Sequence, residues 1–336
     1  MNSGQIMFGQ VNGSEAFPGN HGQASFRDRI CVPFFRDTQN PDGGWGYRPA
    51  HRSAIEPTCW VLLALAGSEE HSELAAASRR GREWLLGTQL PDGSWPAFPG
   101  QNTGCWVTPL ACLALHESGD GSDATTRGVE WLCDAWPGEG SLWRRLRARL
   151  SRSSSVVRQN NSLRGWSWTP GTSSWVEPTA YVLLMLRNLF SDALPRRAAK
   201  RQQLAEAMLY DRMCPDGGWN SGNPFVYGVA GEPLVAPTAW ALLALENHRE
   251  RPENQKSLNW LALAYEQIQG TGSLALAHLC LRTYGRAAAP LEPALEPLYA
   301  ANRFLQSVPV TAFAAIALEP VCEWLRRPAA GARLWG

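Results

Sequence analysis

The sequence contains little or nothing of several features that identify common classes of protein. Charged residues make up only 18% of the 336 positions, lysine occurs only twice, and the formal net charge is +1. A nearly neutral chain has no overall electrostatic attraction to nucleic acid, so we expect no nucleic-acid partner. The chain also has no Asp-rich DDxxD motif, the arrangement that holds magnesium against a diphosphate.

Eight cysteines are present, but their spacing is not that of a disulfide framework or a metal site. None belongs to a CxxC pair, and none lies near paired histidines at the spacing of zinc ligands. Most lie in apolar stretches, where buried free thiols are usually found. We therefore expect reduced thiols, no metal and no cofactor, and a cytoplasmic protein.

Long hydrophobic runs are absent as well. The longest, Cys59 to Ala66, is far too short to span a bilayer. The first 25 residues have neither the basic start nor the apolar core of a signal peptide. We expect residues 1–25 to form a flexible tail and residues 26–336 to form one domain.

The informative feature of the sequence is an internal repeat, which has to be recognised before a fold is assigned. PDGGW occurs at 41–45 and again at 215–219, PDGSW occurs at 91–95, and GWSW occurs at 165–168. Each copy is followed by a short loop and then by an apolar segment that begins near a proline. These segments begin at Glu56, Thr108, Glu177 and Ala236, and two similar ones begin at Ser273 and Ser307.

The apolar segments are predicted to be buried helices. Proline in the first turn costs no hydrogen bond and presets φ, and the leucine and alanine that follow have high helix propensity. Their apolar character continues nearly all round the helix, which is typical of a helix with no face in water. More polar, amphipathic helices are expected between them, at 72–89, 122–136, 194–213 and 252–268.

The alternation of a polar outer helix, a glycine-rich turn and an apolar inner helix predicts an all-α protein. Six inner helices fit the series, and six such hairpins would close into an (α/α)6 toroid, with a ring of inner helices inside a ring of outer ones. Closure hides both faces of every inner helix, whereas an open stack would leave an apolar end exposed to water.

Residues Arg80 to Trp95 read RGREWLLGTQLPDGSW and resemble the QW motif of squalene and oxidosqualene cyclases along its whole length. In those proteins the glutamine and tryptophan tie the end of an outer helix to the next turn, which implies this role for Gln89 and Trp95. Weaker copies extend the resemblance over roughly residues 30 to 325. The chain therefore resembles the prenyltransferase and squalene-cyclase repeat family. Full-length triterpene cyclases have two toroids, and this chain has room for one, which leaves a second cyclase-type subunit as a candidate partner.

The resemblance also implies where an acid would lie. Class II cyclases protonate an alkene or epoxide with the middle Asp of a DxDD motif before an inner helix, and no DxDD occurs here. Glu177 falls at the acid's position, and Glu56 occupies the same place in the first repeat. Burial would raise the pKa of either carboxyl group, which suits a general acid near neutral pH.

Helix capping is the alternative for both carboxyl groups, because carboxylates at helix N-termini are stabilised by the macrodipole and by free N–H groups. Glu232, in the loop before Pro237, is a third candidate acid, and simple solvation is its alternative. The zinc site of protein prenyltransferases is not expected, because the starts of the inner helices offer no matching histidine.

Aromatic residues are concentrated at the same predicted end of the inner helices. Trp60, Tyr181 and Trp240 each lie three residues after a helix-start proline, which predicts a ring around the mouth of a cavity. Aromatic faces stabilise cations, and cyclases of this kind handle carbocations in that way. Structural packing is the alternative for several of these residues. The predicted substrate-binding residues are Tyr47, Trp60, Trp106, Trp168, Trp175, Tyr181, Tyr227, Glu232 and Trp240.

A basic insertion follows the second repeat at 141–165, with seven arginines and no acidic residue. Its Leu142, Trp143, Leu146 and Leu150 share one face of a helix, a pattern typical of helices that lie on anionic membranes. Two other interpretations stay open: the arginines bind a diphosphate head group, or the segment is a solvated loop.

Together these features predict a terpene cyclase-like enzyme that binds an isoprenoid in the central cavity and cyclises it by acid-initiated carbocation chemistry. One alternative is an isoprenoid-binding protein without activity, or a cyclase subunit that needs a partner. The other is an unrelated (α/α)6 hydrolase that uses Glu56 and Glu177 as its pair of carboxyl groups.

Overall fold

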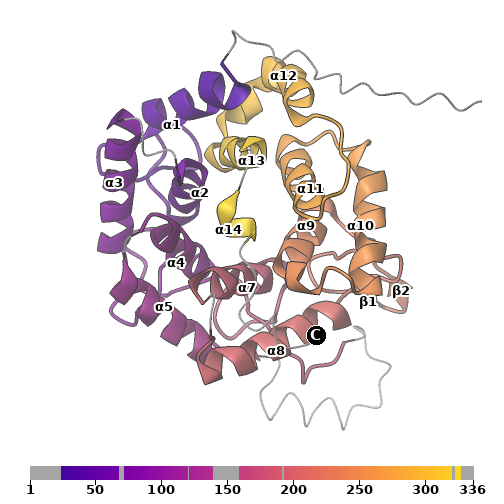
Figure 1. Ribbon diagram of the computed structural model, residues 1–336. Coiled ribbons are helices and arrows are strands. Elements are labelled where there is room, and N and C mark those ends of the chain that lie inside the picture. Colours follow the sequence, from indigo (N-terminus) through magenta and orange to yellow (C-terminus); the bar gives the residue numbers. More distant parts are fainter. Residues whose placement is uncertain are drawn as a thin grey trace, which may run out of the picture.

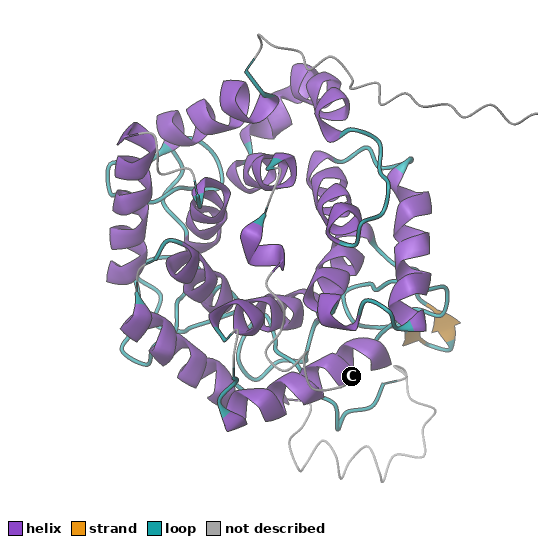
Figure 2. Ribbon diagram, viewed as in Figure 1, coloured by secondary structure: helices purple, strands orange, loops and turns teal. Residues whose placement is uncertain are grey.

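The protein is built as two concentric rings of helices, as Figures 1 and 2 show. The computed structural model describes residues 24–67, 72–119, 121–138, 159–190, 193–319 and 322–326. The inner helices are α2 (Ile55–Leu65), α4 (Thr108–Glu117), α7 (Val176–Leu189), α9 (Val235–Ala244), α11 (Thr271–Thr283) and α13 (Val308–Leu318). The outer helices are α1 (Val32–Thr38), which follows η1 (Arg27–Cys31), α3 (Ser72–Gly87), α5 (Ser122–Asp134), α8 (Arg196–Asp211), α10 (Pro252–Tyr265) and α12 (Leu291–Asn302).

The inner helices contact one another in a closed cycle. Helix α2 packs on α4, α4 on α7, α7 on α9, α9 on α11, α11 on α13, and α13 returns to α2. Outer helices cover them from outside, with α3 on α2, α5 on α4, α8 on α7, and α10 between α9 and α11. The predicted all-α toroid is confirmed.

Burial follows the sequence pattern closely on the inner ring. Every residue of α2 is buried except Glu56, which is only part-buried. The segment is apolar on all sides, as expected for a helix with no face in water. One face of α2 packs against the outer helices, and the other faces the interior of the ring. A polar residue in such a helix is therefore exceptional and marks a position with a special environment.

The repeated turns share one set of hydrogen bonds. In each, the backbone N–H of a tryptophan donates to a threonine Oγ1 in the first turns of the following inner helix, over 2.9–3.0 Å. The indole N–H of the same tryptophan donates to a backbone carbonyl near the end of the preceding outer helix, over 2.6–2.9 Å. The pairs are Trp45 with Thr58, Trp95 with Thr108, Trp166 with Thr179, and Trp219 with Thr238.

In the turn that matches the QW motif, the side chain of Gln89 makes two further hydrogen bonds. The Nε2 of Gln89 donates to the carbonyl of Gly93 in the turn and to the carbonyl of Ala124 in the next outer helix, α5. Gly93 has a φ of +88°, and a Cβ at that position would lie 2.6 Å from the Arg127 carbonyl oxygen. The turn therefore needs glycine both for its backbone conformation and for its close approach to α5.

Two parts of the fold differ from the simple repeat. The fourth turn carries a short hairpin, β1 (Phe225–Val226) with β2 (Val229–Ala230), which lengthens the spacing from tryptophan to threonine from 13 to 19 residues. Helix α14 (Glu323–Arg326) lies inside the ring of inner helices in Figure 1.

Residues 1–23 of the predicted tail at 1–25 and residues 141–158 of the basic insertion at 141–165 lie outside the described residues.

Candidate active site at the mouth of the ring

The end of the ring at which the inner helices begin, here called the mouth, carries two carboxyl groups in an apolar setting. Glu56 lies in the first turn of α2. Its Oε2 accepts a hydrogen bond from the Tyr47 hydroxyl over 2.5 Å, and its Oε1 accepts one from the Trp60 indole N–H over 3.3 Å. Burial raises the pKa of Glu56, and these two bonds offset part of that rise because they stabilise the charged form.

Glu177 occupies the equivalent place in the first turn of α7. Its Oε2 atom is buried and has no hydrogen-bond partner among the described residues. Burial raises the pKa of Glu177 as well, and the hydrogen bond from its own backbone N–H lowers it only in part. A buried carboxyl oxygen without a partner favours the protonated, neutral group.

Tyr181 lies close enough to both acids for their charges to affect the pKa of its hydroxyl. Burial raises the pKa of its hydroxyl, and the charges of Glu56 and Glu177 raise it further. Both carboxyl groups therefore lie within electrostatic reach of one phenol, although they come from helices on different sides of the ring. The N-cap residues of the two helices are Ala54 and Trp175, and neither makes a side-chain capping bond. Glu177 accepts a hydrogen bond from its own backbone N–H in the first turn of α7, so the capping interpretation remains for this residue.

One helical turn further in, aromatic side chains from several helices meet and form what we call the aromatic layer. Trp60 of α2 and Trp240 of α9 are stacked, with ring centroids 5.3 Å apart and planes at 24°. Tyr181 meets Trp240 edge to face at 5.2 Å, and Phe313 of α13 meets Trp60 edge to face at 4.9 Å. The layer consists of Trp60, Tyr181, Trp240 and Phe313, continued by Trp106 and Trp168.

This arrangement differs from the open ring that the sequence led us to expect. Trp60, Tyr181 and Trp240 are 1%, 7% and 3% exposed, because they pack on one another across the ring. Edge-to-face and offset contacts at these distances are favourable in their own right. At this depth the three side chains form a floor beneath the mouth and leave no open passage between them.

The other predicted site residues divide into three groups. Tyr47, Trp106 and Trp168 lie at the mouth, since Trp106 contacts both Trp168 at 4.9 Å and Tyr181 at 6.0 Å. Trp175 is the N-cap residue of α7 and pairs through its backbone with Trp166. Tyr227 is 79% exposed at the tip of the hairpin, and Glu232 is exposed in the loop before α9, so neither joins the two acids.

Phe313 is a member of the aromatic layer that the sequence reasoning missed. The expectation counted residues from the helix-start proline, and Phe313 lies four residues after Pro309 rather than three. Counted from the first helical residue, Phe313 is five positions into α13, as Trp60 is in α2. Counting from the start of each helix would have found it.

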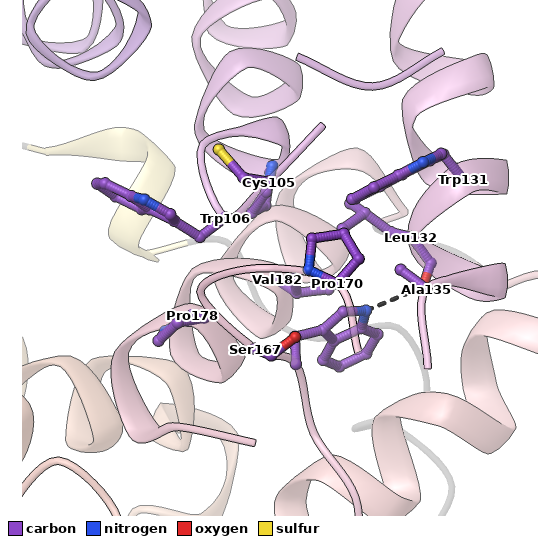
Figure 3. A pocket seen from close by; sticks show the side chains of 11 residues that line it. Cys105, Trp106, Trp131, Leu132, Ala135, Ser167, Pro170, Pro178 and Val182 are labelled. Carbon is purple, nitrogen blue, oxygen red and sulfur yellow. Dashed lines mark hydrogen bonds between the residues drawn. The ribbon is translucent and has the colours of Figure 1, made fainter. Parts of the chain in front are cut away.

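A narrow hollow with a cavity volume of only about 10 Å³ adjoins the layer between α4, α5 and α7. Figure 3 shows Trp106 on one side of it and Trp131 and Leu132 on another. Pro178, which follows Glu177 in the chain, also lines the hollow. Its wall is thus apolar and reaches the neighbourhood of one of the two acids.

The described part of the chain has neither a cluster of metal ligands nor a helix that could cross a membrane. No three side chains of His, Cys, Asp or Glu come together there as a set of metal ligands. None of the described helices combines the length and the apolar character that a membrane crossing requires.

The sequence matches one protein family and is similar to several known proteins. The family model described as the squalene-hopene cyclase C-terminal domain matches residues 47–273, more than half of the chain. A terpene cyclase–glycosyl transferase fusion protein of Humicola fuscoatra is 30% identical over 240 residues, which cover 65% of this chain and 17% of that protein. A drimenyl diphosphate synthase of Streptomyces showdoensis is 27% identical over 256 residues, which cover 64% of this chain and 46% of that protein. The chain thus spans less than half the length of these relatives.

Solved structures share the fold. The type II terpene cyclase MstE from Scytonema, without ligand, superposes with a TM-score of 0.53 at 16% identity, covering 87% of this chain and 96% of that one. A variant of MstE bound to geranylgeranyl dihydroxybenzoate, named as its substrate, gives a TM-score of 0.54 at 15% identity, covering 87% and 95%. A cellobiose 2-epimerase from Spirochaeta thermophila gives 0.52 at 13% identity, covering 86% and 82%. At these identities the likeness establishes the toroid and no particular reaction.

Proposed function

Because the chain belongs to the squalene-hopene cyclase C-terminal domain family, we propose that it is a terpene cyclase-like enzyme that protonates and cyclises an isoprenoid at the mouth of the ring. The observation that carries the proposal is the placement of two desolvated carboxyl groups, Glu56 and Glu177, over one aromatic layer. Carbocation chemistry needs both parts: an acid that is neutral near pH 7, and π-faces that stabilise positive charge.

Hydrogen bonding favours Glu177 as the proton donor. Both oxygens of Glu56 already accept hydrogen bonds, from Tyr47 and Trp60. The buried Oε2 of Glu177 has no protein partner among the described residues, so it can bond to a substrate without losing a protein contact. In the proposed step the proton leaves this carboxyl group, which becomes a carboxylate. The proton adds to an alkene carbon, where the π electrons form the new C–H bond, or to an epoxide oxygen, whose C–O bond then breaks. Either path leaves a carbocation on the substrate.

The aromatic layer then provides the surface on which that cation is stabilised. Each well-placed aromatic face contributes about 0.5–2 kcal/mol toward a nearby cation. Trp106 and Trp168 are only part-buried at the mouth, so their rings remain accessible from outside, whereas Trp60 and Trp240 are almost fully covered. The accessible rings are the ones we expect a substrate to touch first.

Incubation with candidate substrates tests the proposal. The purified chain is mixed with squalene, oxidosqualene and polyprenyl diphosphates, and cyclic products are sought by gas chromatography and mass spectrometry. We expect a cyclic product from one of them, lost in Glu177→Gln and retained in Glu232→Gln, which changes an exposed carboxyl group at the same end. No product from any substrate would count against an independent cyclase.

A second candidate is a domain that binds the hydrocarbon but needs a partner for turnover. The closed packing of Trp60 on Trp240 favours it, because a long chain cannot pass the floor as it stands. A second cyclase-type subunit and an anionic membrane surface reached through residues 141–165 remain the proposed partners. Family membership gives no support to the unrelated hydrolase.

A further inference from the structure

A segment of the chain itself occupies the interior of the ring away from the mouth. Figure 1 shows α14, in yellow, surrounded by the inner helices. Its Trp324 and Leu325 side chains are 3% and 0% exposed, and Cys322 just before it is 7% exposed. A helix of four residues is too short to be stable alone, so α14 owes its place to packing against the ring.

One arginine fixes the depth at which α14 lies. Arg187, near the C-terminal end of α7, donates from Nη2 to the Leu325 carbonyl over 3.3 Å. Its Nη1 donates over 3.0 Å to the carbonyl of Leu243, near the end of α9. Both inner helices end here, so α14 lies at the opposite end of the ring from the acids. Arg187 is only 5% exposed, and burial lowers its pKa.

The fit of α14 in this position is incomplete. The indole N–H of Trp324 is buried and has no hydrogen-bond partner among the described residues. A buried donor that loses water without gaining an acceptor opposes the packing that holds the side chain. The surroundings of the indole thus suit a hydrocarbon better than they suit tryptophan, while Arg187 supplies a donor at one edge for a single oxygen atom.

We propose that this interior is a binding site for a hydrocarbon chain ending in a neutral oxygen, such as a prenyl alcohol, and that α14 occupies the site until such a ligand displaces it. Trp324 and Leu325 take the place of the hydrocarbon, and the Leu325 carbonyl takes the place of the terminal oxygen. The choice of a prenyl ligand rests on the proposed function. The site itself rests on the position and contacts of α14.

Farnesol binding to the full chain tests the inference without any turnover. A ligand that competes with α14 has its affinity reduced by the fraction of molecules in which the site is occupied. Trp324→Ala weakens α14, so we expect calorimetry to show farnesol binding about tenfold tighter than to the wild type. Leu263→Ala, which removes a side chain 76% exposed on the outer helix α10, should leave the affinity unchanged.

Hydrogen exchange of the wild type gives a readout that does not depend on a variant folding. Bound farnesol should speed amide exchange in residues 322–326, and farnesene, which lacks the oxygen, should bind more weakly than farnesol. Slower or unchanged exchange in 322–326, or no farnesol binding to either wild type or Trp324→Ala, overturns the site. Absence of product in the cyclisation assay overturns the proposed function instead, so the two failures are distinguishable.

Discussion

Trp60 stacks on Trp240 at 5.3 Å although α2 and α9 are separated by two helices in either direction around the inner ring. This contact closes the ring one turn below Glu56, whose Oε1 accepts a hydrogen bond from the Trp60 indole. The same side chain thus forms part of the floor and positions one of the two acids. Stability and the candidate chemistry are therefore coupled at Trp60.

Removing Trp240 should destabilise the ring strongly. Trp240→Ala deletes a side chain that is 3% exposed and contacts Trp60, Tyr181 and Phe313, so we expect a loss of about 3–5 kcal/mol in the free energy of unfolding. Urea denaturation measures it. Leu263→Ala is the control, with an expected change within about 0.5 kcal/mol. Similar effects of the two variants would show that the aromatic layer is not packed as described.

The repeated threonine should matter at each turn. Thr108 accepts a hydrogen bond from the Trp95 backbone N–H and is fully buried, so Thr108→Val leaves a buried donor without a partner. We expect a loss of about 1–3 kcal/mol in the free energy of unfolding. Thr126→Val removes an exposed hydroxyl on α5 and serves as the comparison in the same denaturation experiment. An equal cost at both positions would contradict the structural role of the turn.

Stability should depend on pH through Glu177. Its pKa in the folded chain lies above the ordinary value of 4.5, so the folded state holds its proton at a pH where the unfolded state has lost it. Stability from this group is full below about pH 4.5 and falls as the pH rises through the raised pKa. Unfolding measured at several pH values should show a shallower fall in Glu177→Gln than in wild type. An identical pH profile in Glu177→Gln and wild type would mean that Glu177 titrates normally.

Loss of the Tyr47 hydroxyl should raise the pKa of Glu56 further. The hydrogen bond from Tyr47 lowers that pKa, because it stabilises the charged carboxylate. Carbon NMR of carboxyl-labelled glutamate would follow the titration in Tyr47→Phe. Tyr227→Phe changes a phenol that is 79% exposed and should leave the Glu56 signal where it is. A lower pKa for Glu56 in Tyr47→Phe would contradict the hydrogen bond.

Much of the architecture could be predicted because local sequence patterns determine the helices and the turns between them. The prolines and leucines of α2 and α7, and the glycines of the turns, fix helices and connections without reference to the rest of the chain. The two acids were assigned through the resemblance to the cyclases, in which the acid precedes an inner helix: Glu177 falls at that position, and Glu56 is its equivalent in the first repeat. Their pairing with one Tyr181 follows from closure of the ring.

What could not be predicted depends on contacts across the ring. Stacking of Trp60 on Trp240 joins helices far apart in the sequence, and no local pattern reports the distance between them. The place of α14 inside the ring is of the same kind, since four residues carry no periodicity that distinguishes an interior position from a surface one. A threonine recurs next to the helix-start proline, after it in three copies and before it at Thr108, but its hydrogen-bond partner became clear only in three dimensions.

Deuterium incorporation tests the proposed proton transfer most directly. The chain is equilibrated in D2O and then given the substrate that yields a cyclic product, and the product mass is compared with that formed in H2O. If Glu177 delivers its exchangeable proton to carbon, each product molecule gains one deuterium, and Glu177→Gln forms no product. For a substrate that is protonated at an alkene carbon, a product without deuterium would contradict the account. For an epoxide, whose oxygen takes the exchangeable proton, undiminished product formation by Glu177→Gln would contradict it.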